Sequence, residues 1–584
     1  MTHLITAILV FSILDRTFNS GSSGIRLKRD SVFIAFSVSL LWAVHPLTTS
    51  AVSYITQRAE SLVSMFYLLT IYCVIRSSSA TGKMFSTIWC IAAVAACSFG
   101  MASKEVMISA PFIIFIYDSL FLSSGMKDAL KRRGPLYGML VLTCGILICN
   151  AIDAGGRGGT AGFDTDITRE AGYILTQSRA FIRYLLLSYW PSDLVFDYGT
   201  SLNRTVSEIW PFLILSIAIV VNEIGVLFYK PRVAFVGLFV FAVLAPSSSI
   251  IPVKTQTIAE HRIYLSLSAV ILFTVLALHH AWEPIEKRIK KSYQITGALL
   301  LILITATILG YMTILRNRDY RSELAIWTDT TKKLPENARA WMYTGTALLN
   351  QNQGNPSEKE VLEAIAMLNQ AVARDPSYVL SYANRGLAFY KAKRYEEALR
   401  DYDKAVSMNL NKAELFNNRG ILHGETGNTL NALKDFTAAV KIDPQFALAH
   451  SNLGSASAAL ANDYMNRGEE ENAVREFKNA IHNFSNALKF DSSMVKAFKG
   501  RAAAYSMVGM HKEAADDCSR IISISPSSSD AFLDRAICHY NLGKYHEAWQ
   551  DIENGKKLGG LPNPEFIMMV AKEAGLAGNG IENR

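Results

Sequence analysis

The motif Asn384-Arg385-Gly386 recurs 34 residues later as Asn418-Arg419-Gly420 and once more as Asn452-Leu453-Gly454. Further along the chain, Arg501-Ala502 and Arg535-Ala536 are again 34 residues apart. A fixed period of this length is typical of a solenoid protein, in which each repeat is one unit of secondary structure. Such a unit buries its apolar face only against its neighbours, so several consecutive repeats are needed for a stable fold. The period therefore decides the architecture of the second half of the chain.

Small residues reinforce this period. They stand twelve positions after the Gly or Ala of four of these motifs, at Ala398, Ala432, Ala514 and Ala548. With a period of 34 residues, they are the signature of the tetratricopeptide repeat (TPR), a pair of antiparallel helices. We expect about six repeats over residues 338–562, the fourth of them (447–494) longer by 14 residues, and a cap or tail over 563–584. TPR arrays rarely do chemistry, so any catalysis is expected in the other half.

The first half of the 584-residue chain has a different composition. Residues 1–315 carry many apolar runs of 15–22 residues, and such runs predict helices that span a membrane. Residues 316–584 are rich in Ala, Asn and charged residues with helical periodicity. We therefore predict an all-α fold, with a polytopic helical membrane domain over 1–315, a linker over 316–337 and then the TPR α-solenoid. The ten expected spans are 1–14, 31–46, 61–75, 85–102, 106–122, 135–152, 207–229, 232–250, 263–281 and 294–315.

The short loops between the expected spans alternate in charge. Five of them lie on one side of the membrane if the spans are as given, and they contain the basic residues Arg26, Lys28, Arg29, Arg76, Lys83, Lys127, Lys131, Arg132, Arg133, Lys230, Arg232, Lys287, Arg288, Lys290 and Lys291. The positive-inside rule predicts that this side is the cytoplasm. The TPR array then lies on the outer side of the membrane. Because basic residues cluster between spans, the net charge of +8 does not indicate a nucleic-acid partner.

Charged residues mark two expected outer segments near the first spans. His45 precedes a polar stretch that ends with Arg58 and Glu60, and Lys104 and Glu105 form a tight turn between two spans. Charges at the end of an apolar helix are costly unless they are paired or exposed to water, so they indicate a substrate-binding site. Lys104 is suited to hold a phosphate, and Glu105 to orient a base or bind a metal ion. Equally, Arg58 and Glu60 are compatible with side chains that reach the membrane interface, and the Lys-Glu turn with a hairpin kept at the surface.

A third charged cluster, Glu260-His261-Arg262, opens a later span. Arg262 is well placed to bind a polyprenyl phosphate, since a guanidinium holds a phosphate through two hydrogen bonds. His261 is as compatible with a residue satisfied at the membrane interface as with a ligand. Between the charged clusters, residues 153–207 form a long outer loop. Its stretch 173–190 is amphipathic, which predicts a helix lying on the outer membrane surface.

These motifs, in this order, resemble those of a known family. They are His45-Pro46, Gln57-Arg58-Ala59-Glu60, Ser103-Lys104-Glu105, Tyr117-Asp118, Trp190-Pro191, Asp197-Tyr198 and Glu260-His261-Arg262-Ile263-Tyr264-Leu265. With the trailing TPR array, the chain is similar over nearly its whole length to the transmembrane-and-TPR proteins related to protein O-mannosyltransferases, especially their bacterial members. The resemblance implies a membrane glycosyltransferase of the C type. Such an enzyme transfers a mannose-like sugar from a polyprenyl-phosphate carrier to protein hydroxyl groups; whether a divalent metal takes part is left open.

One feature departs from the family pattern. The family's catalytic carboxylate lies in an acidic motif of the first outer loop, after a first span, whereas Met1-Thr2-His3-Leu4 resembles a second span already under way. The sequence is therefore expected to be cut at its amino end, and the catalytic residue has no counterpart in it. Asp164 and Asp166 are not assigned that role by the resemblance. In an intact relative, the carboxylate would deprotonate a Ser or Thr hydroxyl, while Lys104 and Arg262 would stabilise the departing phosphate.

Two other functions are compatible with the same sequence. The first is a non-catalytic, membrane-anchored TPR scaffold for envelope assembly. The second is a transporter or flippase for lipid-linked sugars, which should carry polar groups at mid-membrane and inverted internal repeats, and neither is evident. The closeness of the resemblance favours a bacterial inner membrane with the array in the periplasm over the endoplasmic reticulum with the array in the lumen. The expected partners are membrane lipid, lipid-linked sugar and acceptor or partner proteins bound by the TPR.

In the array, Asn384, Asn418 and Asn452 share one position of successive first helices. Stacked repeats align them as a ladder on the concave face, where side-chain amides are suited to bind an extended peptide, although capping or local packing explains them as well. The arginines one position further on are more typical of packing than of ligand binding. Cys518 and Cys538 form a disulfide outside the cytoplasm only if their Cα atoms are close enough. No Cys or His spacing indicates a metal site.

Overall fold

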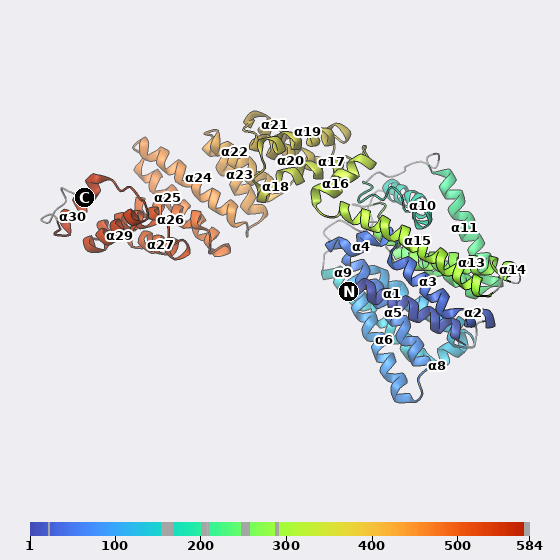
Figure 1. The fold of residues 1–584 in the computed structure, drawn as a ribbon. Coiled ribbons are helices and arrows are strands. Elements are labelled where there is room, and N and C mark those ends of the chain that lie inside the picture. The colour runs from blue at the N-terminus through green and yellow to red at the C-terminus, as the bar shows by residue number, and fades with distance from the viewer. Residues whose placement is uncertain are drawn as a thin grey trace. The chain divides into compact units, whose positions relative to one another are not determined.

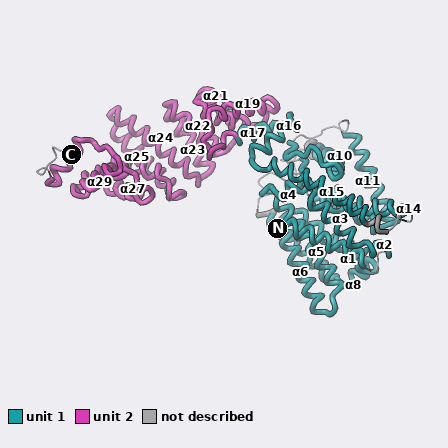
Figure 2. The backbone as a smooth tube through the Cα atoms, viewed as in Figure 1, with its two compact units in different colours: residues 1–347 teal, residues 348–584 magenta. Residues whose placement is uncertain are grey.

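The computed structural model describes residues 1–20, 24–153, 167–199, 207, 209–246, 257–286 and 291–576. Within these residues every regular element is a helix and none is a strand, which confirms the predicted all-α fold. The helices form two compact units, Met1–Ala347 and Leu348–Arg584 (Figure 2). The residues of the earlier predictions that lie outside the described ranges are Asp164, Asp166, Lys287, Arg288 and Lys290.

The regular elements described in the first unit are helices (Figure 1). Its α-helices are α1 (Thr2–Asn19), α2 (Ile25–Arg29), α3 (Ser31–Ala43), α4 (Thr49–Ser53), α5 (Arg58–Ser78), α6 (Lys83–Ser103), α7 (Ala110–Tyr117), α8 (Met126–Leu142), α9 (Cys144–Asp153), α10 (Ile167–Tyr189), α11 (Trp210–Tyr229), α12 (Pro231–Ala245), α13 (Ser266–Ala281), α14 (Glu283–Glu286), α15 (Lys291–Asp319), α16 (Glu323–Lys333) and α17 (Ala338–Leu349). The shorter 3-10 or π segments are η1 (Pro46–Thr48), η2 (Ile55–Gln57), η3 (Glu105–Ser109), η4 (Asp118–Leu122) and η8 (Glu260–Ile263).

Several of the apolar helices in the first unit are short or bent. Six described helical segments are long and apolar enough to cross a membrane, and α3 with η1–α4, bent by 57°, makes a seventh if the pair is one span. The apolar helices α12 and α13 have only 15 and 16 residues. The first helix, α1, carries Asp15 and Arg16 near its end. Ten spans are therefore not confirmed, although the described residues of each expected span are mostly helical.

Helices α1, α3, α5 and α6 form the centre of the first unit, with α1 packed on α3 and α5, and α5 packed on α6. Trp42 of α3 and Tyr67 of α5 are fully buried there. Hydroxyl groups inside these helices, such as those of Ser37 and Thr70, donate to the backbone carbonyl four residues earlier. This local bond satisfies a buried hydroxyl without a partner helix. The connecting polar segments are thus held by a well-packed scaffold.

Residues in or beside three of the basic loops that the sequence places on one side of the membrane line shared cavities of the first unit. Arg26 pairs with Glu283 at 3.1 Å, and both line a cavity together with Lys230 and Arg232. Lys230 and Arg232 also line a second cavity with Ser124, which lies just before α8. This clustering agrees with the alternation of loops predicted from the sequence. That these loops face the cytoplasm stays a prediction.

The second unit is a series of antiparallel helix pairs (Figure 1). Its α-helices are α18 (Gln351–Gly354), α19 (Glu358–Arg374), α20 (Val379–Lys391), α21 (Tyr395–Ser407), α22 (Ala413–Glu425), α23 (Thr429–Ile442), α24 (Ala447–Asn466), α25 (Glu470–Phe490), α26 (Val495–Met507), α27 (His511–Ile524), α28 (Ser529–Asn541), α29 (Tyr545–Lys557) and α30 (Pro564–Glu573). The longest of them, α24 and α25, have 20 and 21 residues and form the fourth repeat, where the sequence predicts a lengthened hairpin.

The recurring glycine lets the two helices of a repeat approach closely. A Cβ atom on Gly420 of α22 would lie 2.8 Å from the ring of Phe436 on α23, and one on Gly386 of α20 would lie 2.7 Å from the ring of Tyr402 on α21. A side chain at either position would overlap the aromatic ring in a closely packed interface. The glycine of the sequence motif is therefore required by helix packing.

The recurring arginine belongs to an ion-pair network inside the array. Arg419 donates from Nε and Nη2 to the two carboxylate oxygens of Asp435 in its own repeat, at 2.8 and 2.7 Å. Its Nη1 donates to Asp403 of the preceding repeat at 2.8 Å. Equivalent two-bond forks join Arg385 to Asp401, Arg501 to Asp517 and Arg535 to Asp551. These arginines are packing residues, as expected from their position in the repeat.

The fourth repeat has a different polar connection, because Leu453 takes the place of the arginine. There, Asn452 donates from its amide to the Asn417 side-chain oxygen at 2.9 Å. The oxygen of Asn452 accepts a hydrogen bond from Lys496 at 3.3 Å. Side chains of the third, fourth and fifth repeats are thus linked through the Asn452 amide rather than through an arginine fork.

The two cysteines of the array lie in neighbouring helices. Cys518 of α27 and Cys538 of α28 belong to one buried apolar cluster. Both are free thiols, and a hydrogen bond joins their side chains. A disulfide between them stays a prediction.

Candidate functional site

Glu60 and Lys104 form an ion pair between two of the segments predicted to be functional. Glu60 lies in the first turn of α5 with 4% of its side chain exposed, and Lys104 follows the last residue of α6. The backbone of Lys104 is extended, with φ −163° and ψ 153°, which ends α6 and begins the turn into η3. Two segments 44 positions apart in the sequence thus meet through one buried ionic contact.

His261 of η8 joins this pair from a third segment. Its Nε2 lies 3.9 Å from the Glu60 Oε1 atom, the same oxygen that binds Lys104. Burial lowers the pKa of His261 well below its ordinary value, and the charges of Lys104 and Arg262 lower it further. The imidazole is therefore neutral near pH 7, with one nitrogen able to donate and the other able to accept. The cluster combines an ammonium, a carboxylate and a neutral imidazole.

Glu260, the neighbour of His261, has a separate set of partners. Its Oε1 accepts hydrogen bonds from the backbone N–H of Val195 at 2.6 Å and from the hydroxyl of Tyr198 at 2.9 Å. Burial raises the pKa of Glu260, while the positive charges of Arg316 and Lys333 and the two hydrogen bonds oppose that rise. Glu260 therefore anchors the loop that follows α10 against η8.

The same loop is fastened to the helices that follow α15. Arg339 donates from Nη1 to the Asp197 carboxylate at 3.1 Å, and Asn337 donates to the Asp197 backbone carbonyl at 2.8 Å. Lys333 of α16 donates to the Leu194 carbonyl at 3.0 Å. Sequence reasoning assigned these basic and amide residues to a linker and a first repeat and missed their role. The available signal was Asp197 itself, which stands in one of the motifs that carry the family resemblance.

His45 braces the backbone beside the cluster. Its Nδ1 accepts a hydrogen bond from the Leu47 N–H at 3.2 Å, which caps η1. Its Nε2 lies 3.2 Å from the carbonyl oxygen of Ser188, near the end of α10. Both ring nitrogens are therefore engaged with backbone groups. The structure places His45 in a positioning role, and substrate binding by it stays a prediction.

The three remaining predicted residues lie in different environments. Arg58 is exposed at the start of α5. Glu105 is buried at the start of η3, directly after Lys104. Arg262 is also buried, and its Nη1 donates to the carbonyl of Thr257 at 3.2 Å. Substrate contact by each of them stays a prediction.

The amino end of α1 contributes a histidine that sequence reasoning missed. His3 contacts the Tyr264 hydroxyl through Nδ1 at 2.8 Å and the Ala43 carbonyl through Nε2 at 2.9 Å. Its ring lies 4.8 Å from that of Trp42, and the Trp42 indole donates to the Tyr264 carbonyl at 2.9 Å. Tyr264 lies three residues after His261. Its contacts with His3 and Trp42 therefore hold the end of η8 and α3 to α1. The sequence feature that could have identified His3 is its position as a polar residue within an apolar run.

Lys104 carries the positive charge of the cluster. Within the described ranges, no group of three or more His, Cys, Asp or Glu side chains is placed to hold a metal ion. The Lys104 ammonium donates one hydrogen bond to Glu60, which leaves two donors for other acceptors such as phosphate oxygens, and the ion pair fixes the direction in which it points. The side chain of Lys104 is 14% exposed, so it is reached from outside the core.

The three asparagines of the array differ in accessibility. Asn452 is buried, and its amide is bonded to Asn417 and Lys496. Asn384 and Asn418 are half-buried. The three side chains therefore do not form a ladder of equivalent, exposed amides. Peptide binding by these residues stays a prediction.

Comparison with known proteins identifies relatives of both halves. Tetratricopeptide-repeat families match residues 379–411 and 413–446, which confirms the predicted repeat type. A protein O-mannosyl-transferase of Caenorhabditis elegans is 25% identical over 366 residues, 59% of this chain and 46% of the relative. Human protein O-mannosyl-transferase TMTC4 is 24% identical over 387 residues, 59% of this chain and 50% of the relative. The predicted family resemblance is confirmed.

The relationship to the protein O-mannosyl-transferases extends over part of those proteins. Human TMTC3 is 25% identical over 438 residues, 68% of this chain and 46% of the relative. The chain thus spans about half the length of the protein O-mannosyl-transferases it matches. Among solved structures, the TPR protein YrrB is 21% identical with a TM-score of 0.28, over 35% of this chain and 95% of YrrB, and this likeness carries no argument about function.

Proposed function

We propose that this chain is a membrane glycosyltransferase-like protein that transfers a mannose-like sugar from a polyprenyl-phosphate carrier to hydroxyl groups of proteins. Its relatives are named protein O-mannosyl-transferases, and its first unit contains helices long and apolar enough to span a membrane. The site is the cluster of Glu60, Lys104 and His261. The site and the TPR array both lie on the outer side of the membrane, in the bacterial periplasm or the lumen of the endoplasmic reticulum.

The observation that carries this proposal is the buried ion pair of Glu60 with Lys104 beside His261. Removing two charges from water is costly, and an ion pair at such a place adds little to stability. Charged residues retained within or beside membrane helices therefore indicate function. Three separate sequence motifs supply these residues, and the sequence predicts substrate binding by each of them.

In this function, Lys104 binds the phosphate of the sugar donor and stabilises the negative charge that grows on it as the glycosidic bond breaks. Glu60 holds the ammonium group in place. His261, being neutral, donates or accepts one hydrogen bond to the sugar or phosphate without adding charge. The carboxylate that deprotonates the acceptor hydroxyl is not assigned to a residue of this chain.

The loop that ends in Tyr198 couples the site to the chain leading into the array. Tyr198 donates to Glu260, which adjoins His261, and Asp197 is bound by Arg339 of α17. The helices that precede the repeats are thereby fixed next to the proposed donor site. In the proposed function, the TPR array binds the acceptor or a partner protein, and the chain that emerges from this junction leads directly to it.

Donor binding by the full chain in detergent tests the proposal. A radiolabelled polyprenyl-phosphate mannose is titrated against wild type and the Lys104→Gln variant, and transfer to a Ser/Thr-containing protein is followed in parallel. Loss of one charge-assisted contact to phosphate is expected to weaken donor binding about tenfold or more. Lys83→Gln is the matched control, because Lys83 is an exposed lysine at the other end of the same helix.

Equal donor affinity in wild type and the Lys104→Gln variant would remove Lys104 from the site. If wild type binds no donor while its array still captures envelope proteins, the non-catalytic scaffold becomes the better description. That second function rests on the tetratricopeptide matches alone.

A further inference from the structure

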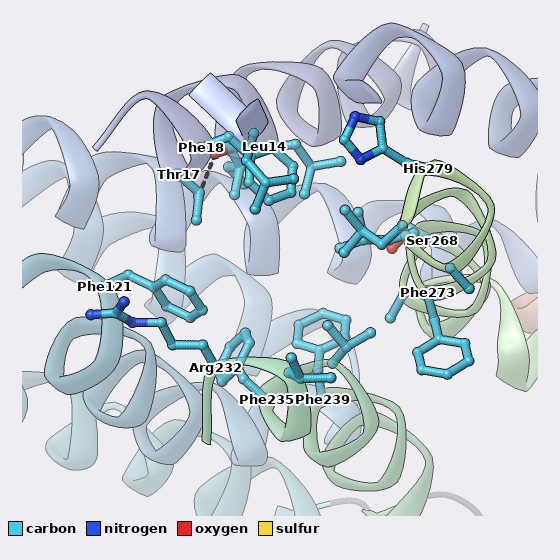
Figure 3. A pocket seen from close by; sticks show the side chains of 18 of the residues that line it. Leu14, Thr17, Phe18, Phe121, Arg232, Phe235, Phe239, Ser268, Phe273 and His279 are labelled. Carbon is cyan, nitrogen blue, oxygen red and sulfur yellow. Dashed lines mark hydrogen bonds between the residues drawn. The ribbon is translucent and has the colours of Figure 1, made fainter. Parts of the chain in front are cut away.

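A large apolar cavity lies toward the other end of the first unit, away from Glu60 and Lys104. It has a volume of about 750 Å³ and opens between α1, α12 and α13 (Figure 3). Leu14 and Phe18 of α1 face it from one side, Phe239 of α12 and Phe273 of α13 from others (Figure 3). An apolar space of this size within a membrane protein is suited to hydrocarbon chains.

Two cations stand where this apolar cavity meets a smaller polar one. Lys230 and Arg232, on either side of the first residue of α12, line both spaces. The smaller cavity, of about 500 Å³, is otherwise lined by residues that include Ser119, Ser123 and Ser124. A cationic and hydroxyl-bearing pocket thus adjoins a hydrocarbon-sized one. The smaller cavity thus matches the polar head group of a phospholipid, and the larger one matches its acyl chains.

The nearby carboxylates are already paired with other cations. Asp118 binds Arg133 at 2.5 and 2.7 Å and accepts from Tyr137 at 2.6 Å. Glu283, the acidic residue among those lining the apolar cavity, pairs with Arg26 at 3.1 Å. The described residues lining the smaller cavity include no acidic side chain. Lys230 and Arg232 are the cations that line both cavities, and Arg232 also donates from Nε to the Leu120 carbonyl at 3.1 Å.

We propose that the two cavities together bind one anionic glycerophospholipid, with its phosphate at Lys230 and Arg232 and its acyl chains between α1, α12 and α13. Basic pockets between membrane helices are sites at which anionic head groups bind. A water-soluble phosphate would leave the apolar cavity without an occupant. The site is distinct from the proposed donor site, since the donor phosphate is placed at Lys104. The bound lipid fills the space between α1 and the α12–α13 pair and stabilises their packing.

Lipid titration of the purified full chain, followed by native mass spectrometry, tests this site. The probes are phosphatidylglycerol, phosphatidylcholine and inorganic phosphate. Wild type is expected to bind phosphatidylglycerol at least tenfold more tightly than phosphatidylcholine. The double variant Lys230→Gln, Arg232→Gln is expected to lose this preference. The double variant Lys127→Gln, Lys131→Gln is the matched control, because it removes two exposed cations that line neither cavity.

A second variant tests the acyl-chain cavity without changing charge. Ala277 is exposed and lines the apolar cavity, so Ala277→Trp occupies part of it without disturbing the buried core. This variant is expected to weaken phosphatidylglycerol binding about fivefold and to leave any binding of inorganic phosphate unchanged. Monodisperse elution and unchanged helical circular dichroism confirm that each variant is folded.

Any of the following results would overturn the proposal. The first is an unchanged lipid preference after loss of Lys230 and Arg232. The second is an equal loss in the Lys127, Lys131 control, which would show non-specific attraction. The third is inorganic phosphate binding as tightly as phosphatidylglycerol, or no lipid preference in wild type, which would mean that a free anion or an apolar protein segment occupies the cavities instead.

Discussion

Arg339 reaches back 142 positions along the sequence to bind the carboxylate of Asp197 at 3.1 Å. Asp197 is 3% exposed, and it also accepts from the Gly199 N–H at 2.6 Å. One buried carboxylate therefore holds the loop after α10 against the helix that leads into the TPR array. Asn337, the last residue of the predicted linker, also donates to the Asp197 backbone carbonyl at 2.8 Å, so this end of the linker packs within the first unit.

Replacing Asp197 with Asn is expected to destabilise the first unit by about 2 kcal/mol, because a buried hydrogen bond between charged groups is lost and Arg339 keeps its charge. The measurements are the melting temperature of the full chain and the rate of protease cleavage within residues 190–199. Asp193→Asn is the control, since Asp193 is exposed in the same loop. Similar effects of the two substitutions would show that the ion pair does not hold the loop.

Two glycines of α22 are expected to respond oppositely to the same substitution. Gly420→Ala places a Cβ 2.8 Å from the Phe436 ring and is expected to cost about 1–3 kcal/mol. Gly424→Ala meets open space in the same helix and is expected to stabilise by up to about 1 kcal/mol through helix propensity. Urea denaturation of the full chain, followed by circular dichroism, distinguishes them. Equal signs would contradict the proposed close packing of α22 on α23.

The two carboxylates bound by Arg419 are expected to contribute differently to the free energy of unfolding. Asp435 is 4% exposed and receives two bonds from the guanidinium, whereas Asp403 is 58% exposed and receives one. Asp435→Asn is therefore expected to cost about 2 kcal/mol and Asp403→Asn less than about 1 kcal/mol. Denaturation midpoints of the two variants provide the measurement. A larger cost for Asp403→Asn would mean that the inter-repeat contact, not the fork, dominates.

The stability of the first unit is expected to fall as pH is lowered below about 6.5. The folded-state pKa of His261 is depressed by burial and by Lys104 and Arg262, so the unfolded chain binds a proton first as pH falls. The contribution of neutral His261 is therefore present above its unfolded pKa of 6.5 and is lost below it, by up to about 1.4 kcal/mol per pH unit. Melting curves between pH 7.5 and 5.5 measure this slope.

His261→Gln is expected to remove much of that slope, whereas His546→Gln is the control because His546 is exposed in the array. A slope unchanged by His261→Gln would assign the acid sensitivity to other groups. Both variants are compared at the same ionic strength, since charges near the cluster are screened by salt.

The repeat architecture could be predicted because its signal is local and periodic. Gly386 and Gly420 recur at a fixed interval, and each serves the same helix contact in its own repeat. The span count could not be predicted as securely. The apolar runs of α12 and α13 are real helices, but 15 or 16 residues are short for a membrane span, and α1 carries Asp15 and Arg16.

The individual residues of the candidate site could be predicted from the sequence, but their contacts with one another could not. Charged residues in apolar surroundings identified Glu60, Lys104 and His261 singly, because their burial is costly wherever it occurs. Their common contact depends on how α5, α6 and η8 pack, and no local pattern encodes that. His3 and Arg339 were missed for the same reason, since their partners lie far away in the sequence.

Leu453 has a consequence for how the array responds to its surroundings. The Arg419–Asp403 contact between the second and third repeats is ionic, and Asp403 is 58% exposed, so dissolved salt screens it. The Asn452–Asn417 bond that joins the third and fourth repeats is neutral and buried, so ionic strength leaves it largely unchanged. High salt is therefore expected to weaken the contact between the second and third repeats more than the contact between the third and fourth.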